Sequence, residues 1–145
     1  KRIYGVLEKQ FRLYFEKAER RKGQTGHNLL IMLETRLDNV VFRLGFAPSR
    51  AAARQMVMHG HVRVDGMRVD IPSYQVRSGQ AVEISERARQ NDFVKNAVDT
   101  AAGRGIPKWL TLEAAAFKGQ VISTPTREDV PLDINEQLIV ELYSK

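Results

Sequence analysis

The sequence contains no cysteine among its 145 residues. Disulfides, thiolate metal sites and cysteine nucleophiles are therefore excluded, and the lack of cysteine fits a reducing compartment. The sequence also has no apolar run near the roughly 20 residues that a membrane-spanning helix needs, and no signal-peptide pattern. We therefore expect a cytoplasmic protein that does not attach to a membrane.

Motifs of catalysis and cofactor binding are missing as well. The sequence has no glycine-rich phosphate loop, no Gly-x-Ser-x-Gly and no carboxylate pair that stands out from ordinary surface charge. His59-Gly60-His61 suggests a metal site, but its histidines flank a helix-ending glycine, and no third ligand follows at a familiar spacing. The sequence therefore predicts a protein that is not an enzyme and that binds neither a cofactor nor a metal.

Positive charge is present in excess but is unevenly distributed. The net charge is +6, and 43% of the residues are hydrophobic, which suits one ordinary domain or two small ones. Residues 1–75 contain 14 Lys and Arg against 7 Asp and Glu, whereas residues 76–145 contain 9 against 10. We expect a polyanion to bind the basic half.

Helical periodicity dominates the first 60 residues. Apolar residues from Ile3 to Ala18 predict a long amphipathic helix that stops at Gly23, and the chain enters it without methionine or a cap, which suggests a piece of a longer protein. A second helix is predicted from Thr25 to Leu44. A third, from Arg50 to His59, has Ser49 as its N-cap.

An alternating pattern with an Asp-Gly turn, Val62 to Val69, then predicts a β-hairpin in which Arg63 pairs with Arg68. The valines and Met67 share the opposite face. Further strands are predicted at 74–76, 81–84, 109–112 and 120–123, with helices at 86–102 and 136–143.

These elements predict an α+β fold in which a small mixed domain is inserted into a helical one. The N-terminal helices and the C-terminal helix form the helical domain, 1–34 with 124–145, because the short final helix must dock to be stable. The inserted domain, 35–123, has two helices in a helix-turn-helix-like arrangement packed on a small antiparallel sheet with the hairpin.

Like charges opposite each other across a β-ladder are destabilising, so Arg63 and Arg68 suggest a phosphate backbone over their face. A solvated face with splayed side chains is the alternative. The preceding helix places Arg50 and Arg54 on one face, and Ser49 lies beside its free backbone amides. Further polar contacts are expected from Gln55, His59 and His61.

The first helix offers a second candidate surface, which is strongly basic at its C-terminal end. The helix dipole alone would favour positive charge there, so a purely structural explanation also stands. The candidate RNA-binding residues of this surface are Arg12, Lys17, Arg20, Arg21, Lys22, Thr25 and Asn28.

Several runs resemble a known family. Ser49-Arg50, Ala53 to Val57, Gly60 to Gly66 and Pro72 to Val76 resemble the RNA-binding module named after the fourth small-subunit ribosomal protein. The resemblance implies that this module covers about 36–84. The segments 2–11, 26–44 and 133–145 resemble the bacterial ribosomal protein family itself. Asp65 departs from the asparagine that is common in the family, and residues 85–128 resemble it less closely.

The resemblance implies a structural constituent of the small ribosomal subunit in the cytoplasm, monomeric in isolation. It implies early binding to 16S ribosomal RNA at a multi-helix junction of the 5′ domain, which nucleates assembly. It also implies contact with the fifth small-subunit protein, an influence on translational accuracy, and in some members repression of their own messenger RNA. Two alternatives remain: an accessory domain of an RNA-modifying or tRNA-charging enzyme, and a helix-turn-helix DNA-binding repressor.

Overall fold

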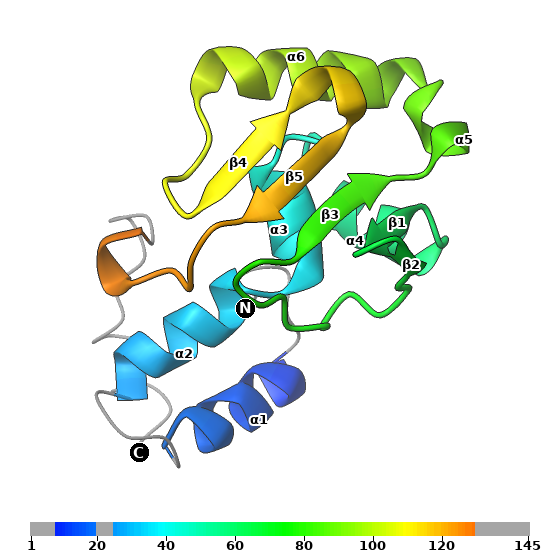
Figure 1. Ribbon diagram of the computed structural model, residues 1–145. Coiled ribbons are helices and arrows are strands. Elements are labelled where there is room, and N and C mark those ends of the chain that lie inside the picture. Colours follow the sequence, from blue (N-terminus) through cyan, green and yellow to red (C-terminus); the bar gives the residue numbers. More distant parts are fainter. Residues whose placement is uncertain (1–7, 20–24, 130–145) are drawn as a thin grey trace. The chain divides into compact units, whose positions relative to one another are not determined.

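In a computed structural model of the protein, residues 8–19 and 25–129 are described. The chain divides into two compact units, Lys1–Glu34 with Pro125–Lys145 and Thr35–Thr124 (Figure 1). Helices combine with a five-stranded antiparallel sheet, which confirms the predicted α+β class.

The domain limits drawn from the sequence, 1–34 with 124–145 and 35–123, stay a prediction. The helix expected at 136–143 lies outside the described residues, and so does its predicted docking onto the first helices. The module limits of about 36–84 likewise stay a prediction.

The first unit contains two helices that pack against each other, α1 (Glu8–Glu19) and α2 (Thr25–Glu34). A short 3-10 helix, η2 (Arg127–Asp129), also contacts α2. Leu29, Leu30 and Leu33 of α2 are fully buried, as their helical spacing predicts.

The single helix predicted from Thr25 to Leu44 is wrong, because the chain leaves helical geometry after Glu34. Arg36 is extended, with φ −62° and ψ 142°, and forms an isolated antiparallel bridge with Gln75. A new helix, α3 (Leu37–Arg43), starts directly after it. The strand predicted at 74–76 is also wrong. Its pairing is limited to this bridge, so the segment does not join the sheet.

The second unit is built on a sheet with the strand order β2-β1-β3-β5-β4, and every neighbouring pair is antiparallel (Figure 1). The strands are β1 (Val62–Val64), β2 (Met67–Arg68), β3 (Ala81–Ile84), β4 (Leu110–Glu113) and β5 (Lys118–Val121). The strand predicted at 81–84 is confirmed. β4 begins one residue later than predicted, and β5 begins two residues earlier than predicted.

Helices cover one face of this sheet. α3 and α4 (Arg50–Met58) lie behind it in the view of Figure 1, and α6 (Asp92–Arg104) runs along its upper end. Val57, Val82, Val98 and Trp109 meet in the shared core. The residues that alternate with the buried ones, such as Arg63 between Val62 and Val64, point away from this core.

The helix predicted at 86–102 is interrupted. The Ser85 hydroxyl accepts a hydrogen bond from the Ala88 amide and caps a one-turn helix, α5 (Glu86–Arg89). The Asn91 carbonyl then accepts from the amides of Val94 and Lys95, which starts α6 as a separate helix. After this break, Val94 of α6 lines one pocket together with Met56 of α4.

Candidate nucleic-acid interface

The β1–β2 hairpin has the predicted register. Arg63 is opposite Arg68, and Val64 is opposite Met67. Asp65 and Gly66 have φ values of 51° and 82°, the positive values that a two-residue Asp-Gly turn needs. Both arginines are exposed, so the hairpin presents two like charges side by side on the face away from the core.

The charges around the arginine pair do not neutralise it. In the β1–β3 register Arg63 also lies beside Glu83, but the Glu83 carboxylate is 3.5 Å from Arg89 Nη2. Arg89 is held there because its Nε donates to the Ile84 carbonyl at 2.7 Å. Among residues 8–19 and 25–129, no carboxylate forms an ion pair with Arg63 or Arg68. Both guanidinium groups therefore keep their donors for an external anion.

Gly60 connects the hairpin to the end of α4. It has φ +78°, and a Cβ added there would overlap the guanidinium group of Arg68. The missing side chain therefore lets Arg68 lie across the helix end, where the dipole favours a cation. The end of α4 and the arginine pair form one surface.

The beginning of α4 is more constrained than the sequence suggests. Ser49 Oγ accepts a hydrogen bond from the Ala52 amide at 3.1 Å, so the hydroxyl caps the helix, an interaction worth about 1 kcal/mol. Arg50 Nε donates to Asn39 Oδ1 at 3.0 Å, and its Cζ lies 4.8 Å from the centroid of the Phe42 ring. These two predicted RNA-binding residues thus have structural contacts of their own.

A buried polar network supports Arg50, and the sequence analysis did not identify it. Arg36, only 1% exposed, donates from Nε and Nη2 to the two carboxylate oxygens of Asp38, both at 3.0 Å. Asp38 Oδ1 also accepts from the Asn39 amide at 2.8 Å. This network fixes the start of α3 and therefore the position of Asn39, whose side-chain amide oxygen accepts the hydrogen bond from Arg50. The sequence feature that could have revealed this network is the presence of the polar residues Arg36, Asp38 and Asn39 within an apolar helical pattern.

The remaining predicted residues of the second unit lie along α4 and just after it. Arg54 and His61 are half-buried, whereas Gln55 and His59 are exposed. The rings of His59 and His61 meet edge to face, with centroids 6.3 Å apart. Gln55 and both histidines line a pocket of about 340 Å³, which we call the α4–α5 pocket.

No group of three or more His, Cys, Asp or Glu side chains within residues 8–19 and 25–129 could hold a metal ion. None of the helices in the same part of the chain is both long and apolar enough to cross a membrane.

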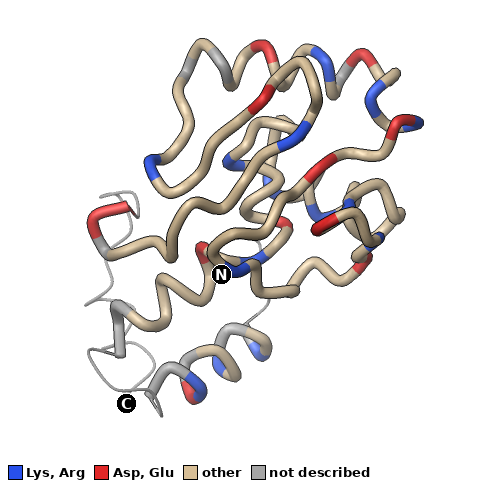
Figure 2. Tube along the Cα trace, in the orientation of Figure 1, with Lys and Arg blue, Asp and Glu red and all other residues tan. Residues whose placement is uncertain are grey.

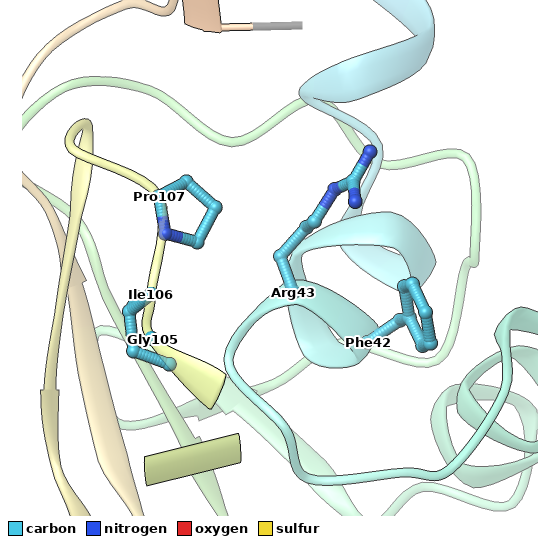
Figure 3. A pocket seen from close by; sticks show the side chains of 5 residues that line it. All are labelled: Phe42, Arg43, Gly105, Ile106 and Pro107. Carbon is cyan, nitrogen blue, oxygen red and sulfur yellow. The ribbon is translucent and has the colours of Figure 1, made fainter. Parts of the chain in front are cut away.

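A second pocket, of about 490 Å³, lies between α3 and the loop that precedes β4 (Figure 3). Arg43 and Pro107 lie on opposite sides of it, and Ile106 lies beside Pro107. Among the lining residues that the structure describes, Arg43 is the one that carries a charge, and none of them is a predicted RNA-binding residue.

The candidate surface of the first unit is only partly described. Arg12 and Lys17 are exposed on α1, where Figure 2 shows the basic residues of this helix. Asn28 on α2 is half-buried, and Thr25 is the first residue of α2. Arg20, Arg21 and Lys22 lie outside the described residues. These residues belong to the first unit, whereas α4 and the hairpin belong to the second.

Comparison with known proteins identifies the family. Residues 35–82 match the model of the S4 domain, and residues 1–34 match that of the ribosomal protein S4/S9 N-terminal domain. The small ribosomal subunit protein uS4 of Geotalea daltonii is 56% identical over 145 residues, all of this chain and 70% of the relative. The protein of the same name from Syntrophus aciditrophicus is 57% identical, with 69% of it covered. The chain belongs to the uS4 family of small ribosomal subunit proteins.

Family membership defines the broad function. The protein is an RNA-binding structural component of the small ribosomal subunit, acts in translation and is not an enzyme. Its place is the ribosome, in the bacterial cytoplasm. The accessory-domain alternative from the sequence analysis is therefore wrong.

The S4 domain match covers only part of the second unit. It includes α3, α4, β1 and β2 and ends within β3, at residue 82. β4 and β5 nevertheless complete the same sheet, and α6 contributes Val94 and Val98 to the same core. The packed unit that carries the candidate interface is therefore larger than the matched domain.

Proposed function

We propose that the protein binds 16S ribosomal RNA at a multi-helix junction in the 5′ domain and that this early binding nucleates assembly of the small subunit. The observation that carries RNA binding at this surface is the exposed pair Arg63 and Arg68, opposed in register and without a carboxylate partner in the described part of the chain. Such a pair costs stability in an isolated protein, and a phosphate backbone offsets that cost. The choice of 16S ribosomal RNA rests on family membership.

The mode of recognition follows from the chemistry of the surface. Double-stranded RNA hides its base edges in a deep, narrow major groove, so proteins recognise it by shape and phosphate position. Arginines on a rigid hairpin and at a helix end suit this task, because their guanidinium groups form paired hydrogen bonds to phosphate. Arg63, Arg68 and Arg54 would fix the register of the RNA junction on the second unit.

Three finer parts of the proposal rest on family membership. We propose contact with the fifth small-subunit protein, an influence of that contact on translational accuracy, and repression of the protein's own messenger RNA. In the last case the messenger RNA would have to present a junction similar to that of the ribosomal RNA, because the same protein surface would bind both RNAs.

The helix-turn-helix alternative predicts that α4 reads bases in duplex DNA. Arg50, at the start of such a recognition helix, is held by Asn39 and by the ring of Phe42, which limits its reach to a base edge. The alternative also gives no role to the arginine pair on the hairpin. These observations favour RNA.

The test is filter binding of the chain to a 5′-domain ribosomal RNA fragment, an unrelated RNA and a duplex DNA across a range of salt. We expect preference for the ribosomal fragment. The double variant Arg63→Ala, Arg68→Ala should reduce the salt slope by about one to two phosphate equivalents. Its folding stability should hold or rise, because the variant removes a like-charge pair.

The matched control is Arg77→Ala with Lys95→Ala, which removes the same charge from exposed residues outside α4 and the hairpin. It should bind the ribosomal fragment nearly as tightly as the unaltered protein. Equal affinity of the unaltered protein for all three nucleic acids would refute the proposal.

A further inference from the structure

We infer that the α4–α5 pocket holds one extruded nucleotide of the bound RNA, with its phosphate on Arg87. The inference deepens the proposed function and rests on it. The pocket lies between α4, the residues on either side of Gly60, and the segment from α5 to the start of α6. Its polar lining consists of Gln55, His59, His61, Arg87 and Asn91.

The size of the pocket suits a single nucleotide. Its volume of about 340 Å³ is near the lower end of the range of about 300–1,000 Å³ that is typical of small-ligand pockets. A duplex cannot enter such a space, whereas one unstacked nucleotide can. Sequence-specific contacts to RNA are usually made to unpaired nucleotides of this kind.

Arg87 is the cation that is available at this pocket. Arg89, two residues later, is committed to Glu83 and to the Ile84 carbonyl. Arg87 is exposed, and in the portion of the chain that the structure describes it forms no ion pair. The neighbouring acidic residues Glu86 and Asp92 are exposed and do not line the pocket. A phosphate at the rim would therefore meet a guanidinium group without a competing carboxylate.

The rest of the lining suits a nucleobase. Met56 and Val94 supply apolar surface, and the imidazoles of His59 and His61 supply flat rings on which a base can stack. The side-chain amides of Gln55 and Asn91 carry both donors and acceptors, which suits the polar edge of a base. Charge, stacking surface and hydrogen-bonding groups thus converge in one small space.

The two sides of the pocket come from different parts of the sequence. Gln55, His59 and His61 lie within the matched S4 domain, whereas Arg87 and Asn91 follow its last matched residue, 82. Both sets line the same pocket, Arg87 from α5 and Asn91 from the segment between α5 and α6. We therefore assign part of the RNA recognition to residues outside the S4 domain.

Two single variants test the phosphate and the base separately, by filter binding of the full chain to the 5′-domain fragment. Arg87→Ala should weaken binding several-fold and lower the salt slope by about one. Ala52→Leu fills the pocket without changing charge and should weaken binding by at least about fivefold, the lower bound for one lost stacking contact, with the slope unchanged.

The controls are Arg77→Ala for charge and Ala51→Leu for bulk, since Ala51 is exposed on α4 and does not line the pocket. Abasic substitutions along the RNA give a test that needs no protein variant. One position should exist where loss of the base weakens binding to the unaltered protein, and Ala52→Leu should be insensitive to that loss.

Three results would overturn the inference while the proposed function stands. In the first, Arg87→Ala and Ala52→Leu weaken RNA binding no more than their controls do. In the second, Arg87→Ala weakens binding but Ala52→Leu does not. In the third, no abasic position in the RNA weakens binding. If the unaltered protein does not prefer ribosomal RNA at all, the proposed function fails first. The two failures are therefore distinguishable.

Discussion

Replacing Gly45 by alanine tests whether α6 is packed onto the S4 domain as the structure shows. Gly45 follows α3 with φ +86°, and a Cβ there would overlap the Cβ of Ala101 in α6. A side chain in the left-handed region costs about 1–2 kcal/mol, and overpacking a core adds about 1–3 kcal/mol. Gly45→Ala should therefore lower the free energy of unfolding by about 2–5 kcal/mol.

Gly79→Ala is the matched control for backbone strain. Gly79 has φ +92°, similar to Gly45, but nothing lies within 4 Å of a Cβ built there. Its replacement should cost only the conformational part, about 1–2 kcal/mol. The difference between the two variants, about 1–3 kcal/mol, isolates the contact with Ala101.

Urea unfolding followed by tryptophan fluorescence is the assay. Trp109 is the single tryptophan of the sequence and is buried in the core of the second unit, so its emission reports on this unit. A double-mutant cycle with Ala101→Gly should recover the contact part of the cost, because the second change removes the overlapping methyl group. Equal costs for Gly45→Ala and Gly79→Ala, or a cycle without coupling, would refute the packing of α6 on α3.

Two further variants address the RNA surface. Gly60→Ala should displace the guanidinium group of Arg68 and lower the salt slope of RNA binding by about one. The control is Gly105→Ala, which is also at positive φ but has no atom within 4 Å of the added Cβ, and it should leave the slope unchanged. An unchanged slope in both variants would show that Arg68 does not need the space at Gly60. Asp65→Asn should keep the hairpin, because the amide oxygen can still accept from the Ala81 amide. It should also raise RNA affinity about twofold at low salt by removing an acid near the phosphates, and unaltered affinity there would contradict that reasoning.

The hairpin could be predicted in detail because its determinants are local. A two-residue Asp-Gly turn fixes the pairing of Arg63 with Arg68 without reference to the rest of the chain. The break after Glu34 could not be predicted in this way. Leucine spacing continues through it, and the helix ends because Arg36 pairs with Gln75, a partner far along the sequence. By contrast, the start of α6 has a local signal, because Asn91, a residue type that favours helix starts, directly precedes Asp92.

The candidate site shows the same division. Helix spacing and the hairpin register were enough to bring Arg54, Arg63 and Arg68 into one unit. The roles of Ser49 as a cap and of Arg50 as a partner of Asn39 depend on contacts that only the folded chain defines. Arg87 was missed because it lies in the predicted 86–102 helix, in the half of the sequence that carries no net positive charge.

The distribution of charge along the sequence is therefore an incomplete guide to the RNA surface, as six arginines of the second unit show. Arg36, Arg50 and Arg89 bond to Asp38, Asn39 and Glu83, and each holds the fold together. Arg63, Arg68 and Arg87 are exposed and, within the described ranges, form no ion pair. Only donors that the fold leaves available can bind phosphate. Two of these three arginines come from the basic half and one from the other, so the interface depends on the position and the contacts of each side chain and not on the net charge of its segment.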